Sequence, residues 1–173
     1  MKTLINLMMA LTTLSLSAQD SVKFVEPVPS HYYDAQPFGV NNHLGEDWNG
    51  PHGGNTDLGE PFFAIGDGVV VASKNYGGGW GNVIIVRHTL PNGIEIESLY
   101  GHAHERFVKE GDTVKAGQTI GTIGNNNGMY YAHLHFEIRT AVGLGPRGGY
   151  GWDREGYMNP RKFYKDFKTR KRK

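Results

Sequence analysis

The fold is indicated most clearly by residues 82–100, which read NVIIVRHTLPNGIEIESLY. β-Branched residues are frequent on both sides of the Pro-Asn-Gly sequence at 91–93. This pattern is typical of a β-hairpin, because Asn and Gly accept the backbone conformations that tight turns require. Residues 82–88 and 93–100 are therefore predicted to form two paired strands.

Further short runs of β-branched and aromatic residues flank this hairpin. They cover residues 62–65, 68–73, 118–123 and 133–139, and Gly, Pro and Asn separate them. A spacing of about ten residues between strands is typical of a sandwich or partly closed barrel. No amphipathic helix is evident, although residues 160–168 can form one or two helical turns. The expected fold class is all-β, with antiparallel sheets in a single domain.

The composition limits the chemistry that the chain can perform. Of its 173 residues 38% are hydrophobic and 20% are charged, as in a soluble protein with a real core. It contains no cysteine, which excludes disulfide bonds, thiolate zinc sites and a cysteine nucleophile. Any metal ion must therefore be held by His, Asp or Glu.

The N-terminus has the layout of a secretory signal peptide. Lys2 precedes an uncharged apolar stretch at 4–16, and small residues follow up to Ala18. Residues 1–18 are therefore predicted to be a signal peptide, followed by a lead segment at 19–42; an uncleaved membrane anchor is the alternative. No other segment is apolar enough to span a membrane. We expect an exported protein, either periplasmic or extracellular.

The charge is distributed unevenly along the chain. Residues 161–173 contain eight basic residues and one acidic residue, whereas residues 19–160 contain 9 basic and 16 acidic residues. This basic C-terminal tail can attract an anionic envelope surface weakly, dock on the acidic body, or remain solvated. Export argues against nucleic acid as a partner.

The histidines suggest a metal site. His133 and His135 are two residues apart on a predicted strand, so that their imidazoles should share one face. His43 and Asp47 add a second potential pair of ligands. A hydrolytic zinc site needs about three N/O ligands and an open position for water. This count is satisfied by His43, Asp47 and one further histidine, either His133 or His135. The spacing leaves open which of these two histidines binds the metal.

Taken together, these residues resemble the lysostaphin/LytM-type zinc metalloendopeptidases, which cut peptides of bacterial cell-wall peptidoglycan. The resemblance covers residues His43 to Arg139, and a weaker similarity is found at residues 158–160. It rests on an ordered set of motifs: His43-x-Gly45-x-Asp47, Gly59-Glu60-Pro61-Phe62-Phe63-Ala64, Gly66-Asp67-Gly68-Val69-Val70, Gly79-Trp80-Gly81-Asn82, Leu99-Tyr100-Gly101-His102, Val108-x-x-Gly111-Asp112-x-Val114-x-x-Gly117-Gln118 and His133-Leu134-His135-Phe136-Glu137.

The resemblance implies a site and a fold. It implies that one Zn²⁺ is bound by His43, Asp47 and His135. His102 and His133 are implied as the catalytic histidines, one acting as general base and the other stabilising the oxyanion. It also implies a groove-bearing antiparallel sheet with a second small sheet, and a peptidoglycan peptide as substrate. We expect the metallopeptidase domain to cover residues 43–160 and the protein to be a monomer.

Some positions depart from the family pattern. Residues 125–132 replace the usual small-residue segment before His133, so that substrate preference cannot be transferred. Glu46 adds a carboxylate beside the expected metal, and we interpret it as facing solvent or supporting a ligand. Trp80 is expected to serve packing, and His104 to lie at the groove edge.

Two other functions are compatible with parts of the sequence. A non-hydrolytic relative that binds wall and activates an amidase would keep the fold, but such relatives usually lack a ligand position. The segment 108–121 also resembles half of a biotinyl or lipoyl carrier domain. A carrier needs an exposed lysine in a hairpin, and no lysine lies between Gly117 and Arg139.

Overall fold

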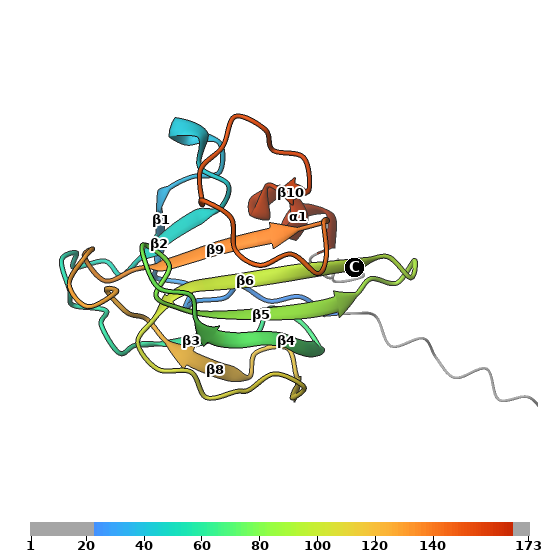
Figure 1. Cartoon of the computed structure of the whole chain (residues 1–173), viewed down its shortest axis with the longest axis horizontal. Coiled ribbons are helices and arrows are strands. Elements are labelled where there is room, and N and C mark those ends of the chain that lie inside the picture. Colours follow the sequence, from blue (N-terminus) through green and yellow to red (C-terminus); the bar gives the residue numbers. More distant parts are fainter. Residues whose placement is uncertain (1–22, 168–173) are drawn as a thin grey trace, which may run out of the picture.

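The computed structural model describes residues 23–167, in which ten strands and a short C-terminal helix surround one main core (Figure 1). The predicted signal peptide (1–18) and the end of the basic tail (168–173) lie outside the described residues. No helix among residues 23–167 has the length and apolar character required to cross a membrane.

Eight strands form one large sheet, and two form a small one. The elements are β1 (Tyr33–Gln36), η1 (Val40–Asn42), β2 (Glu46–Asn49), β3 (Pro61–Phe63), β4 (Gly68–Asn75), β5 (Asn82–Thr89), β6 (Glu95–Ala103), β7 (Thr113–Val114), β8 (Thr119–Thr122), β9 (Leu134–Arg139), β10 (Tyr157–Met158) and α1 (Pro160–Phe167). The large sheet has the order β1-β2-β9-β6-β5-β4-β7, with β10 on β9, and β3 pairs with β8. Every pairing is antiparallel, which confirms the predicted fold class.

The predicted hairpin is the β5–β6 pair. The N–H of Leu90 donates to the carbonyl of Ile94 at 2.8 Å, which closes the turn, and Gly93 adopts a φ of 81° there. A left-handed φ of this kind favours glycine. Strand β6 begins two residues later than expected because Gly93 and Ile94 belong to the turn.

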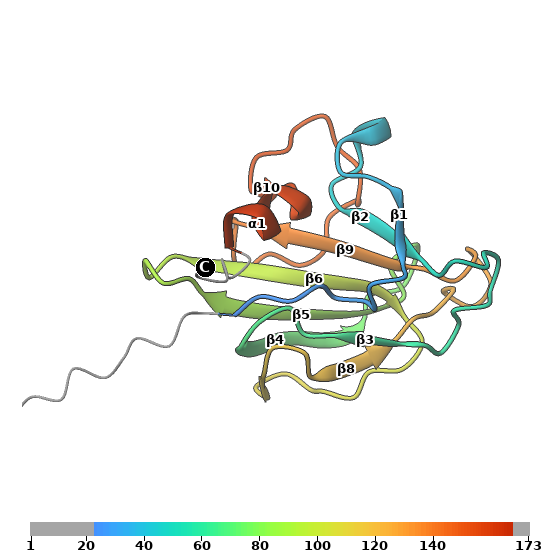
Figure 2. The same cartoon turned by 180° about the vertical axis from the view of Figure 1, so that it is seen from behind.

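The two faces of the large sheet have different partners. On one face Tyr100 of β6 and Phe136 of β9 are fully buried in the main core, together with Phe62 of β3 and Phe163 of α1. Figure 2 shows β3, α1 and the N-terminal segment on this side. Because side chains alternate along a strand, the neighbours of these core residues point to the opposite face. That face carries His135.

The folded unit includes segments on both sides of residues 43–160. Phe24 and Tyr32 from the predicted lead segment are buried in the main core. Residues 160–167, where the sequence allowed one or two helical turns, form α1, and Phe163 packs edge-on against Phe24 with ring centroids 4.8 Å apart. Burial of these apolar side chains holds the flanking segments on the sheet.

Candidate metal centre

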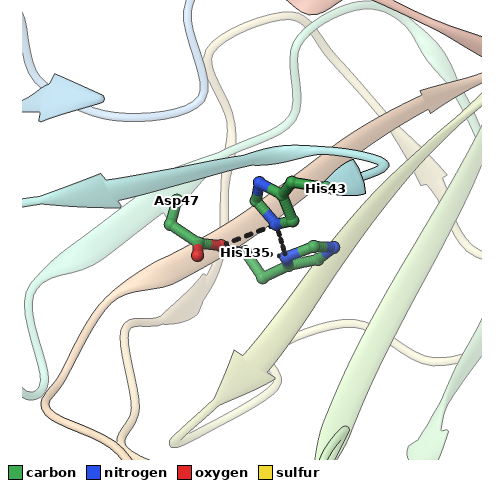
Figure 3. A group of neighbouring side chains, drawn as sticks. All are labelled: His43, Asp47 and His135. Atoms are coloured by element: carbon green, nitrogen blue, oxygen red, sulfur yellow. Dashed lines mark hydrogen bonds and ion pairs between the residues drawn. The ribbon is translucent and has the colours of Figure 1, made fainter. Parts of the chain in front are cut away.

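Three of the predicted site residues meet where β2 and β9 pair (Figure 3). Asp47 and His135 are direct partners in this antiparallel register, and His43 follows η1 just before β2. Nε2 of His43 lies 3.0 Å from Nδ1 of His135 and 3.3 Å from Oδ1 of Asp47. Nδ1 of His135 lies 2.9 Å from the same carboxylate oxygen. The side chains therefore present three donor atoms to one point.

Gly45 explains the spacing between His43 and Asp47. A Cβ atom at Gly45 would lie 2.5 Å from the carbonyl oxygen of Phe136 and 3.1 Å from the ring of His135. A contact of 2.5 Å is far inside van der Waals distance, so that a larger residue would push β2 away from β9. The absence of a side chain brings Asp47 within reach of His135.

Both imidazoles are oriented by a second hydrogen bond. Nδ1–H of His43 donates to the carbonyl of Gln36 at 3.0 Å, and Nε2–H of His135 donates to Oε1 of Glu137 at 3.1 Å. The remaining ring nitrogens, Nε2 of His43 and Nδ1 of His135, point toward each other and toward Asp47, and each would offer a lone pair to a metal ion once its proton is displaced. Metal-bound histidines are typically held by such outer hydrogen bonds. The donor set and its supports thus fit a zinc ion.

The electrostatics also favour a cation at this point. Burial alone would lower the pKa of His135, but hydrogen bonds to Asp47 and Glu137 outweigh burial and raise its pKa to about 9. Burial would raise the pKa of Asp47, yet hydrogen bonds from His135 and His43 hold this pKa below its usual range. The carboxylate is therefore ionised and attracts positive charge.

The two other predicted site residues lie beside this cluster. The ring centroids of His102 and His133 are 4.8 Å apart, and Nε2 of His133 lies 3.8 Å from Oδ1 of Asp47. His102 donates from Nδ1 to the carbonyl of Trp80 at 3.2 Å, and His133 donates from Nδ1 to the carbonyl of Tyr131 at 2.8 Å. Both rings consequently leave Nε2 available.

His102 is neutral at physiological pH. Burial, with a smaller contribution from the nearby rings of His133 and His135, lowers its pKa to about 3. Its backbone has a φ of 60°, which is uncommon for a residue other than glycine and costs conformational free energy. Gly124 makes room for this conformation, because a Cβ atom there would lie 2.1 Å from the carbonyl oxygen of His102.

A groove of about 490 Å³ runs over these side chains. Its lining comprises Gln36, Asp47, Gly79, Trp80, His102, Tyr130, His133, His135, Gly148, Gly149 and Tyr150. One wall is the loop that follows β9, which crosses in front of β9 and β6 in Figure 1. Such a volume is sufficient to accept a short stretch of a peptide.

Two sequence-based expectations about neighbouring residues were wrong. Glu46 neither faces solvent nor supports a ligand: it is 1% exposed on the opposite side of β2 from Asp47, and Oε1 lies 3.6 Å from Nε of Arg161. Strand alternation separates these adjacent residues. His104 lines a small separate hollow with Asn125, because the left-handed backbone at His102 interrupts the alternation.

The comparison with known families agrees with this geometry. The sequence model of peptidase family M23 matches residues 41–148, which is more than half of the chain. The chain belongs to peptidase family M23. This match places the chain in a family of peptidases, as the sequence motifs predicted.

Relatives of this M23 domain carry names of two kinds. Lipoprotein NlpD of Yersinia enterocolitica is 43% identical over 81 residues, which cover 47% of this chain and 78% of NlpD. The NlpD of Escherichia coli is named a murein hydrolase activator and is 37% identical over 100 residues, covering 54% of this chain and 25% of that protein. Peptidoglycan DD-endopeptidase ShyC of Vibrio cholerae is 38% identical over 99 residues, which cover 57% of this chain and 20% of ShyC.

Among solved structures, the peptidase lysostaphin of Staphylococcus simulans has a similar fold. It superposes with a TM-score of 0.57 at 27% sequence identity, over 79% of this chain and 50% of lysostaphin. The M23 chain therefore spans about half of lysostaphin and a fifth of ShyC.

Several residues of the M23 site were not predicted from the sequence. Gln36 and Glu137 orient the two imidazoles, and Trp80 and Tyr150 line the groove. Glu137 could have been found, since it is two residues from His135 and must share its strand face. Gln36 and Tyr150 reach the site from distant segments, and no local pattern marks them. Trp80 belongs to the motif Gly79-Trp80-Gly81-Asn82, but the motif alone does not place its ring in the groove.

Proposed function

We propose that this chain is an exported zinc endopeptidase that hydrolyses peptide bonds of bacterial cell-wall peptidoglycan. The observation that supports this most strongly is the convergence of three oriented donor atoms, from His43, Asp47 and His135, at the floor of an open groove. Two further imidazoles, one of them held neutral by burial, stand over the same point. A purely structural metal site does not require two additional histidines beside its ligands.

In this proposal His43, Asp47 and His135 hold the ion. A zinc ion bound there supplies Lewis acidity, which acidifies a water molecule and polarises a peptide carbonyl. Nε2 of His102 and Nε2 of His133 border the groove, where one can accept a proton from the attacking water. The proton taken from water can then pass to the leaving amine, and the other imidazole, after taking up a proton from solvent at Nε2, can donate a hydrogen bond to the carbonyl oxygen as negative charge develops. Gln36 and Glu137 keep the ligand rings in place.

The alternative function is the activation of a separate wall amidase without hydrolysis. The NlpD relatives favour this alternative, because the E. coli protein is named an activator. The complete set of donor atoms favours hydrolysis, since an activator requires none of them. Both functions place the chain outside the cytoplasm, in contact with peptidoglycan.

One experiment separates the two functions. Purified sacculi are incubated with the wild type, with Asp47→Ala, and with the wild type plus a zinc chelator, and the released muropeptides are identified by mass spectrometry. Hydrolysis predicts cleaved peptides only in the untreated wild type, with recovery after zinc is added back. Unchanged peptides, together with equal stimulation of an added amidase by wild type and Asp47→Ala, would reject the peptidase and support the activator.

A further inference from the structure

From the sequence, Trp80 is expected to serve packing alone. In the structure this side chain contacts several parts of the proposed site. It lies in the turn between β4 and β5, and its indole ring is roughly parallel to the ring of His102, with centroids 6.1 Å apart. The same ring meets His135 edge-on at 5.1 Å. One side chain thus touches both a proposed metal ligand and a proposed catalytic residue.

The backbone of Trp80 also holds His102. Its carbonyl oxygen accepts two hydrogen bonds from that residue, one from the backbone N–H and one from Nδ1–H, each at 3.2 Å. The second bond fixes the tautomer that leaves Nε2 of His102 free. The ring contact and the double hydrogen bond together restrict the imidazole in position and in rotation.

The indole nitrogen points to a different segment. Nε1–H donates to the carbonyl of Arg147 at 2.5 Å, in the loop that forms one wall of the groove. This loop, residues 143–151, is also tied to the segment around His43, since the N–H of Leu44 donates to Gly149 and the N–H of Gly151 donates to Asn42. Trp80 therefore connects His102, His135 and the groove wall.

The far end of the same loop has an independent anchor. Glu97 and Arg139 form an ion pair at 3.2 Å, and both side chains are almost completely buried. Oε1 of Glu97 accepts a hydrogen bond from the N–H of Gly143 at 2.8 Å, and Arg139 donates to the carbonyl of Leu144. The ion pair fixes the loop where it leaves the sheet. Beside the groove two side-chain hydrogen bonds hold the loop, one from Trp80 to Arg147 and one from Nε2 of Gln36 to the hydroxyl of Tyr150 at 3.1 Å.

We propose that Trp80 is a positioning residue that fixes the 143–151 loop and the His102 imidazole in the arrangement needed for hydrolysis. This inference rests on the proposed peptidase function. The two roles use different parts of the side chain: the indole N–H holds the loop, and the ring holds His102. Substitutions can therefore separate them.

The test compares Trp80→Phe and Trp80→Ala with Trp152→Phe, whose tryptophan is 89% exposed and serves as the matched control. Trp80→Phe keeps an aromatic ring but removes the N–H donor. We expect faster hydrogen exchange in peptides covering 143–151, a KM for soluble cross-linked muropeptides raised about fivefold, the scale of one lost hydrogen bond, and a kcat that is little changed. Trp80→Ala should in addition lower kcat by about 10- to 100-fold, because His102 loses its ring support.

Both Trp80 variants should retain the zinc content of the wild type. If Trp80→Phe has the same hydrogen exchange and the same KM as Trp152→Phe, the proposal that the indole N–H anchors the loop is wrong. A kcat in Trp80→Ala equal to that in Trp80→Phe would overturn the support of His102. Failure of the wild type to cleave any muropeptide would instead reject the peptidase function, and the exchange measurement would then still accept or reject the anchor.

Discussion

Oε1 of Glu137 lies 3.1 Å from Nε2 of His135, and both side chains are buried. The two residues share one face of β9, because they are two positions apart on the strand. The hydrogen bond directs Nδ1 of His135 toward His43 and Asp47. Glu137 thereby controls which nitrogen of the ligand is available to a metal.

Replacing Glu137 by Gln should weaken zinc binding without unfolding the domain. The amide can still accept the hydrogen bond but no longer carries the negative charge that increases the basicity of the imidazole. Changes to such outer partners typically cost 10- to 100-fold in metal affinity, and we expect about 10-fold here. Competition with a chromogenic chelator measures the dissociation constant. The control is Glu105→Gln at an exposed position, and equal affinities for both variants would contradict the role of Glu137.

Removal of a proposed ligand should abolish stoichiometric zinc. Elemental analysis of the wild type should give one zinc per chain, whereas His43→Ala and Asp47→Ala should lose the ion because two remaining ligands hold it weakly. Glu110→Ala, at an exposed position, is the matched control. A wild type that is folded and active without metal would disprove the proposed site.

The two histidines above the metal site should be required for turnover but not for zinc. His102→Ala and His133→Ala are each expected to reduce kcat by about 10²- to 10³-fold, the usual scale for proton transfer or oxyanion stabilisation. His104→Ala should behave as the wild type, because its side chain lies outside the groove. Loss of zinc in either of the first two variants would mean that the ligands are misassigned.

His88 should make stability depend on pH. Its ring is 1% exposed, with Nδ1 2.9 Å from the carbonyl of Asp67 and Nε2 2.8 Å from the hydroxyl of Ser98. Burial lowers its pKa from 6.5 to about 4. Between pH 6.5 and pH 4 His88 is protonated in the unfolded state but remains neutral in the folded state. The free energy of unfolding therefore falls as the pH drops toward 4.

The loss attributable to His88 is on the order of 3 kcal/mol between pH 7 and pH 4. Urea denaturation at several pH values gives the free energy of unfolding of the wild type and of His88→Gln. The difference between these two pH profiles measures the contribution of His88. His52→Gln, at an exposed position, should leave the profile unchanged. Parallel profiles for the wild type and His88→Gln would show that this residue does not titrate during unfolding.

The sequence by itself determined six of the ten described strands and the residue types of the site, whereas β1, β2, β7 and β10 were not predicted from it. Turn residues around β-branched runs predicted the β5–β6 hairpin, since both signals are local. The absence of cysteine limited the ligands to His, Asp and Glu. The spacing of His133 and His135 predicted that their rings share one side, and both line the groove, although β9 begins at Leu134. These are properties of neighbouring residues, which the backbone fixes with a period of two.

Only the tertiary structure decided what surrounds that site. Gln36, Trp80 and the 143–151 loop reach His43, His102 and His135 from segments that are far apart in the chain. The burial of Phe24 and Phe163 likewise depends on which strands provide the opposing surface. Contacts of this kind are selected by packing of the whole core, because a side chain carries no local signal of the distant partner against which it packs.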